Sequence, residues 1–229
     1  MADSRVPIIS FASTKGGCGK TTLAFVIATA IARRLAPASE YRVACIDCDP
    51  NGTLDAAIRK TGDPDIWCMP SDAETLLPTL RDAQRCAGLV LIDLEGSANQ
   101  AMLYACGKSD LVLIPAQPSA YDVREARKSA DVVSQAADLV GRDIEVRVVL
   151  TRTPVLRQRV AEHSRVQFAN VGLPVLPVEL VQRTAFQQMT YSGVPPFKAD
   201  PGGGAAANVE ALIDAITELV GLRVERVAA

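Results

Sequence analysis

The chain has few aromatic residues and no long uninterrupted apolar run. Aromatic side chains make up only 4% of its 229 residues, whereas 48% are hydrophobic. We therefore expect a core built mainly from Ala, Val, Leu and Ile, a composition common in proteins with buried parallel strands. No segment is long enough to span a membrane, and no basic and then apolar leader opens the sequence. These absences favour a soluble cytoplasmic protein with one domain over residues 1–229.

The chain also lacks a large excess of either positive or negative charge. The net charge is −2 and the isoelectric point is near 5.5, so nucleic-acid binding would need a local basic patch. The single histidine, His163, stands among charged residues, where a solvated side chain is expected. Cys45 and Cys48 form one C-x-x-C pair, but no second pair lies at the spacing of a zinc site. Buried thiols are expected there, not a metal or redox centre.

Short apolar runs alternate with stretches of helical spacing. The expected strands are 6–11, 42–46, 88–92, 111–114, 144–150 and 173–178. The expected helices are 21–35, 73–86, 98–106, 121–140, 155–171 and 205–222. This alternation predicts a doubly wound α/β fold, whose mainly parallel sheet is flanked by helices on both faces. The last helix is expected to pack on the domain, because its polar positions are acidic as often as basic and it has no aromatic residue for a membrane surface.

A glycine-rich loop between the first strand and the first helix carries the strongest functional signal. Residues 13–22 read S-T-K-G-G-C-G-K-T-T, and a strand, such a loop and then a helix form the context of a phosphate-binding loop. Backbone N–H groups and the helix N-terminus would cradle the phosphates of ATP. Lys20 would reach the β- and γ-phosphates, and the Thr21 hydroxyl would bind Mg²⁺. The predicted nucleotide-binding residues of the loop are Gly16, Gly17, Cys18, Gly19, Lys20, Thr21 and Thr22.

Two later strands end in carboxylates. The expected strand 42–46 leads into Asp47-Cys48-Asp49-Pro50, and the expected strand 88–92 leads into Asp93, the Walker B pattern. Asp93 is predicted to hold Mg²⁺ through a bound water. The residues after it are Leu94-Glu95-Gly96, where Gly96 provides a flexible point beside the γ-phosphate. For Glu95, a solvated loop carboxylate is the favoured interpretation.

Together these motifs resemble the ParA/MinD family of ATPases, which carry a deviant Walker A loop with an early lysine, here Lys15. The resemblance extends over about residues 6–220 and implies a P-loop NTPase fold, ATP and Mg²⁺ as ligands, and an ATP-dependent homodimer. It implies that Lys15 reaches the partner's nucleotide, that Asp49 positions the attacking water, and that Asp47 lies near Mg²⁺. Thr151 and Pro177 are placed near the adenine by the same resemblance. Asn51 stands where the family usually has Gln, and Leu94-Glu95-Gly96 where it has T-P-P.

In ParA-type proteins, basic residues on late helices bind DNA without sequence preference. The matching residues here are Arg157, Arg159, Arg165 and Arg183. The implied function is a weakly active, nucleoid-associated ATPase that segregates or positions a plasmid or other cargo and is stimulated by a ParB-like or other adaptor protein. Solvated helix faces remain the alternative for these arginines. The alternatives for the whole protein are a MinD-like membrane-associated ATPase and a metabolic ATP-dependent enzyme on the same fold.

Overall fold

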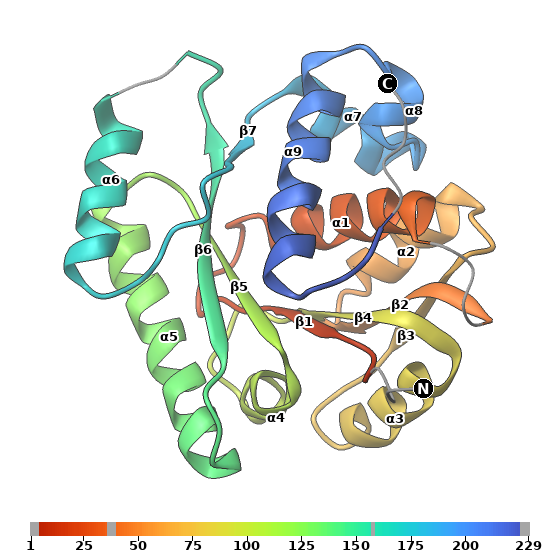
Figure 1. Ribbon diagram of the computed structural model, residues 1–229, viewed down its shortest axis with the longest axis horizontal. Coiled ribbons are helices and arrows are strands. Elements are labelled where there is room, and N and C mark those ends of the chain that lie inside the picture. Colours follow the sequence, from red (N-terminus) through yellow and green to blue (C-terminus); the bar gives the residue numbers. More distant parts are fainter. Residues whose placement is uncertain (1–4, 36–39, 157–158, 225–229) are drawn as a thin grey trace.

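The computed structural model describes residues 5–35, 40–156 and 159–224. Within these residues, seven strands form one parallel sheet in the order β3-β2-β4-β1-β5-β6-β7 (Figure 1). The strands are β1 (Ile8–Phe11), β2 (Tyr41–Cys48), β3 (Ile66–Pro70), β4 (Ala87–Leu94), β5 (Leu111–Ala116), β6 (Glu145–Thr153) and β7 (Leu180–Val181). The helices are α1 (Lys20–Arg34), α2 (Thr53–Thr61), α3 (Leu76–Cys86), α4 (Gln100–Lys108), α5 (Ala120–Val140), α6 (Arg159–Asn170), α7 (Thr184–Ser192), α8 (Pro196–Ala199) and α9 (Gly204–Leu219).

Helices cover both faces of the sheet, which confirms the predicted doubly wound architecture. One core contains side chains of α1, α2, α7, α8 and α9, and the other contains side chains of α3, α4, α5 and α6 (Figure 1). The central strands are buried on both faces, so their sequences are apolar in succession instead of alternating: β5 has no polar residue and β1 has only Ser10. None of the described helices is both long and apolar enough to span a membrane.

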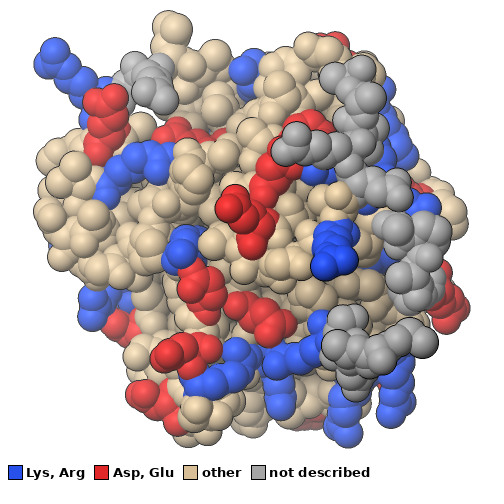
Figure 2. Space-filling view, viewed as in Figure 1, with Lys and Arg blue, Asp and Glu red and all other residues tan. Residues whose placement is uncertain are grey.

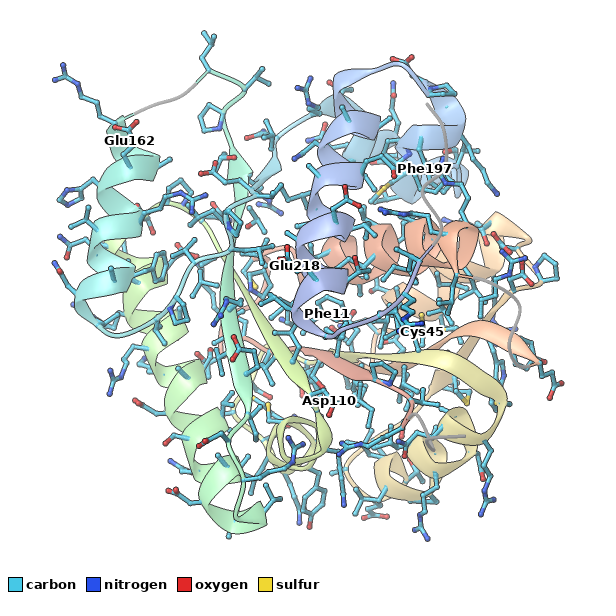
Figure 3. The ribbon with its side chains drawn as sticks, in the orientation of Figure 1. Phe11, Cys45, Asp110, Glu162, Phe197 and Glu218 are labelled. Carbon is cyan, nitrogen blue, oxygen red and sulfur yellow. The ribbon has the colours of Figure 1, made fainter. Side chains whose placement is uncertain are left out.

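The C-terminal helix α9 packs against α1. Its apolar stripe is buried in the core that also holds Phe11 and Cys45, which lie beneath these helices in Figure 3. At the edge of this contact, the guanidinium of Arg34 is only 3% exposed and forms ion pairs with Glu210 and Asp214 of α9. The two carboxylates neutralise the buried positive charge, which would otherwise be costly to remove from water.

The elements differ from the sequence predictions mainly at the two edges of the sheet. Neither β3 nor α2 was predicted, because both are enclosed by turn residues, at 50–52, 62–65 and 70–72. The predicted strand 173–178 is wrong: only Val175 forms a bridge, with Val148, and β7 lies further on at Leu180–Val181. Pro174 and Pro177 interrupt that run, and proline cannot donate to a sheet ladder.

The outer edge at β7 is closed by a side chain of α9. Asn208 donates from its amide nitrogen to the carbonyl of Glu179 at 2.7 Å and accepts the N–H of Val181 at 3.0 Å. These two bonds occupy backbone groups on either side of Leu180, where an exposed strand would otherwise present free partners.

Candidate nucleotide-binding site

Three strands deliver their loops to the same edge of the sheet. Phe11 of β1 and Asp47 of β2 both pair in register with Asp93 of β4. The loop 13–19 after β1, the loop after β2 and the loop after β4 therefore start side by side. In doubly wound sheets, this carboxyl edge is where ligands bind.

The glycine-rich loop has the backbone geometry that its sequence predicts. Gly17 (φ 72°) and Gly19 (φ 102°) adopt left-handed conformations, which favour glycine. Gly16 and Gly17 are exposed, whereas the Lys20 side chain is buried and its Nζ lies 3.4 Å from the carbonyl oxygen of Lys15. A buried ammonium below exposed glycines at a helix N-terminus is suited to bind an anion.

A buried threonine attaches this loop to β6. The Thr151 hydroxyl donates to the carbonyl of Cys18 at 2.8 Å, and a Cβ on Gly19 would lie 3.6 Å from the Thr151 methyl group. Thr151 therefore supports the loop from below. The position beside the adenine that the resemblance implied for this residue stays a prediction.

Helix α5 holds the other end of the loop. The Thr14 N–H donates to Ser129 Oγ at 3.0 Å, and its hydroxyl donates to Glu125 at 3.0 Å. Lys15 Nζ lies 3.0 Å from Asp122 Oδ2, and the Asp122 side chain is only 5% exposed. In the single chain the early lysine is thus paired within its own subunit, and it must leave Asp122 before it can reach another.

The two aspartates at the strand ends have different surroundings. Both carboxylate oxygens of Asp93 are buried, and neither has a hydrogen-bond partner of normal geometry among the described residues. Burial raises the pKa of Asp93 to about 7, while the nearby Thr21 hydroxyl and Lys20 ammonium lower it. An unpartnered carboxylate beside a hydroxyl is the oxygen donor set that Mg²⁺ uses, so these residues fit the ion.

Asp47, by contrast, is fully occupied by backbone donors. Its two oxygens accept the N–H groups of Asp49 at 3.1 Å and Asp55 at 3.0 Å. Burial raises its pKa, and these backbone hydrogen bonds lower it. Asp47 therefore orders the loop between β2 and α2 and fits an outer position near a metal better than direct coordination.

Asp49 is held in a tight turn with Asn51. One Asp49 oxygen accepts both the backbone N–H of Asn51 at 2.9 Å and its side-chain amide at 2.8 Å. Asn51 thus has a local partner here, and its short side chain is long enough for that contact.

The loop after β4 touches the glycine-rich loop. A Cβ on Gly96 would lie 2.9 Å from both the N and Cα atoms of Gly16, closer than side-chain atoms approach a backbone. Glu95 is half-buried and accepts hydrogen bonds from Ser97 and Asn99. Ser97 and Asn99 therefore hold one oxygen of this side chain in place, a contact that the interpretation of Glu95 as a solvated loop carboxylate did not include.

A cavity of about 560 Å³ extends from Gly19 along β6 and α7. Its lining includes Thr22, Thr151, Arg152, Gln182, Arg183, Phe186, Gln187 and Tyr191. Because this cavity lies next to the glycine-rich loop, it is suited to bind a nucleoside. Pro177 does not line this cavity but a separate one of about 460 Å³ beside α6, so the structure does not bring Pro177 to the expected position.

No sequence pattern indicated that α7 forms one wall of this cavity. The residues from Gln182 to Tyr191 match no phosphate or metal motif, and their helix was not predicted. One structural signal marks the region: Arg152 is the one non-glycine residue with a left-handed backbone (φ 53°) in the described part of the chain.

The predicted DNA-binding arginines are not equivalent. Arg165 donates two hydrogen bonds to Glu179 and one to the carbonyl of Leu176, so its charge is already matched. Arg159 is exposed at the start of α6, and Arg183 borders the nucleoside cavity. Neither forms an ion pair with a described residue, and Arg157 lies outside the described residues.

The overall charge distribution is mixed. Figure 2 shows Lys and Arg interspersed with Asp and Glu over most of one face. The C-x-x-C cysteines are both buried and lie in the two different cores, on opposite faces of the sheet. The structure thus confirms the expectation of buried thiols.

The chain matches the CobQ/CobB/MinD/ParA nucleotide-binding domain over residues 9–218. It belongs to this family. The ParA/MinD resemblance of the motifs is confirmed, and the sheet described above is the P-loop NTPase fold of that family.

Relatives within the family are similar over nearly their whole length. The chain is 30% identical over 218 residues to Protein ParA of Rhizobium radiobacter, covering 92% of this chain and 96% of that protein. It is 26% identical over 215 residues to maintenance of carboxysome distribution protein A of Halothiobacillus neapolitanus, covering 91% and 94%.

Solved structures share the fold at lower identity. A Cyanothece McdA variant in complex with ATP has a TM-score of 0.78 at 17% identity, covering 99% of this chain and 100% of that chain. The cell division ATPase MinD of Pyrococcus furiosus has a TM-score of 0.71 at 18% identity, covering 93% and 99%.

Proposed function

We propose that this protein is a ParA-like ATPase that binds ATP and Mg²⁺, forms a nucleotide-sandwich homodimer and binds DNA non-specifically in that state. It segregates or positions a plasmid or other cargo in the cytoplasm, on the nucleoid, and a ParB-like or other adaptor protein stimulates hydrolysis. The observation that carries the proposal is the convergence of Lys15, Lys20, Asp49 and Asp93 at one sheet edge in a chain of the ParA/MinD family.

The residues divide the work of phosphate chemistry as follows. Lys20 and the exposed N–H groups of the loop bind the β- and γ-phosphates, while Thr21 and Asp93 hold Mg²⁺ and Asp47 keeps the neighbouring loop in place. When bound, Mg²⁺ neutralises charge that develops on the phosphate oxygens. Asp49 accepts a hydrogen bond from water and orients it toward the γ-phosphate.

Dimer formation is linked to the ion pair between Lys15 and Asp122. A triphosphate on a partner subunit carries more negative charge than one carboxylate, so it competes for the Lys15 ammonium. Lys15 then contributes to the partner's site only when ATP is present. The buried Asp122 holds it in the absence of that ligand.

DNA binding is proposed for the arginines that have no carboxylate partner. Arg183 and Arg159 meet this condition, whereas the ion pair with Glu179 makes Arg165 a weaker candidate than the sequence indicated. Contacts to phosphates alone would suffice, and such binding weakens steeply with salt.

The test is a mobility shift of two unrelated duplexes with ATP and with ADP, over a range of salt. The ATP form of the wild type is expected to bind both duplexes, and Arg159→Glu, at an exposed position away from the nucleoside cavity, to weaken both equally with a salt slope lower by about one per protomer. Arg81→Glu, on α3, is the charge-matched control and should bind normally. If the wild type binds no DNA at low salt but sediments with anionic liposomes in ATP, the membrane alternative replaces this proposal.

A further inference from the structure

The loop after β4 carries a second carboxylate at the sheet edge where Asp49 lies. Asp47 pairs in register with Asp93, and Cys48 pairs with Leu94. Asp49 and Glu95 are the residues that directly follow these two neighbouring strand ends. Both acids follow strand ends at the edge where the phosphate-binding loop lies.

Glu95 is anchored by one oxygen only. Its Oε2 accepts hydrogen bonds from Ser97 Oγ at 3.2 Å and from Asn99 Nδ2 at 3.1 Å. Asn99 is itself fixed, because its Oδ1 caps α4 by accepting the N–H of Met102 at 2.9 Å. The other Glu95 oxygen, Oε1, accepts no hydrogen bond from the described residues.

The neighbouring backbone places this carboxylate near the phosphates. A Cβ on Gly96 would lie 2.9 Å from the Gly16 nitrogen, so the loops are in direct contact. Phosphates bound at Gly16 and Gly17 would consequently lie beside residues 95–96. A purely structural carboxylate is a poor explanation here, since the site already holds Asp47, Asp49 and Asp93, and added negative charge opposes the binding of ATP.

We propose that Glu95 is a second catalytic carboxylate of the ATPase, and that Ser97 and Asn99 are its positioning residues. Glu95 Oε1 accepts a hydrogen bond from the attacking water. The water oxygen forms the new bond to the γ-phosphorus, the bond from that phosphorus to the β–γ bridging oxygen breaks, and its electron pair stays on ADP. The water proton passes to solvent. This inference rests on the proposed ATPase function.

Single-turnover release of γ-phosphate from ATP, with ATP affinity measured separately by calorimetry, tests it. Glu95→Gln is expected to bind ATP within threefold of the wild type and to hydrolyse it about 10²–10⁴-fold more slowly. Glu95→Asp should recover part of the rate. Asn99→Asp keeps a good helix cap but loses the amide donor, so the rate should fall while ATP affinity and melting temperature hold.

Hydrolysis by Glu95→Gln within threefold of the wild-type rate would overturn the inference. So would a tenfold loss of ATP affinity in that variant, because Glu95 would then be needed for the loop structure and not for the reaction. If the wild type binds no ATP, the proposed function fails as a whole. The wild-type calorimetry separates that result from a failure of Glu95 alone.

Discussion

Lys15 and Asp93 illustrate how single side chains in this site are held in a state that ligand binding must change. Lys15 is 38% exposed and its partner Asp122 is buried, so when Lys15 leaves the pair, Asp122 stays buried without its counterion. Among the described residues, neither carboxylate oxygen of Asp93 has a hydrogen-bond partner of normal geometry. The ion pair opposes the release of Lys15, whereas the buried Asp93 carboxylate lowers the stability of the unliganded protein and is relieved by a bound cation.

Replacing Lys15 is expected to abolish dimerisation without unfolding the protein. Lys15→Ala is expected to stay folded and to remain monomeric with ATP in light scattering. The lost ion pair should cost about 1 kcal/mol, because Gln117 and Ser119 still donate hydrogen bonds to Asp122. Asp122→Asn frees the lysine and should dimerise at lower ATP concentrations than the wild type. Normal dimerisation by Lys15→Ala would contradict the role of this lysine across the interface.

Asp93→Asn is expected to stabilise the protein in the absence of Mg²⁺. The folded pKa of Asp93 is raised from 3.8 to about 7, so the folded protein holds this proton more tightly and loses stability as pH rises between those values. Asparagine carries no such charge. The gain of the variant over the wild type should therefore be small near pH 4 and grow to a few kcal/mol above pH 7, since one pKa unit is worth about 1.4 kcal/mol. Urea unfolding with a chelator at several pH values measures it, and an equal gain at pH 4 and pH 8 would contradict the burial argument.

At the scale of elements, the important contacts are those between loops and the helices behind them. The phosphate-binding loop is held by α5 through Thr14 and by β6 through Thr151, and it touches the loop after β4 at Gly96. Because the backbones of Gly96 and Gly16 touch, a substitution that displaces one of these two loops is expected to displace the other.

Gly96→Ala tests this contact. The added methyl group cannot fit against Gly16, so the two loops must separate, and ATP affinity is expected to fall at least tenfold. Gly202→Ala is the matched control, since a Cβ there meets nothing within 4 Å. Calorimetric titration with ATP distinguishes them. If both variants bind as the wild type does, the two loops must adjust freely.

Sequence patterns predicted these elements unequally, for physical reasons. Long buried strands such as β4 and β5 and the long helix α5 have unambiguous apolar periodicity, and the glycine-rich loop has a chemistry that few other sequences share. The edge strand β7 has only two residues, and β3 ends in a proline and buries only Ile66 and Met69, so neither resembles the long buried runs of the central strands. The partners of Lys15, Glu95 and Arg165 depend on distant side chains that no local pattern can indicate.

At the scale of the whole molecule, ligand binding and folding are coupled because one edge of the sheet collects loops from across the chain. A ligand that binds only the folded state adds about 2.7 kcal/mol at a concentration 100 times its Kd. For a domain of this size, that corresponds to a rise in Tm of about 5–10 °C.

ATP with Mg²⁺ is expected to raise the Tm of the wild type by this amount and to leave Lys20→Ala unchanged. Lys20 is only 7% exposed and is the buried cation of the phosphate-binding loop. Lys108→Ala, at an exposed position at the end of α4, is the control that should respond like the wild type. Scanning calorimetry gives the comparison, and stabilisation of Lys20→Ala by ATP would rule out this lysine as the phosphate ligand.

The bridge that Asn208 makes across β7 has a consequence for contacts between copies of the chain. Asn208 occupies the backbone groups on either side of Leu180 through which another chain would add a strand at that edge. Two copies that meet at this edge therefore cannot pair their strands there without displacing the Asn208 side chain.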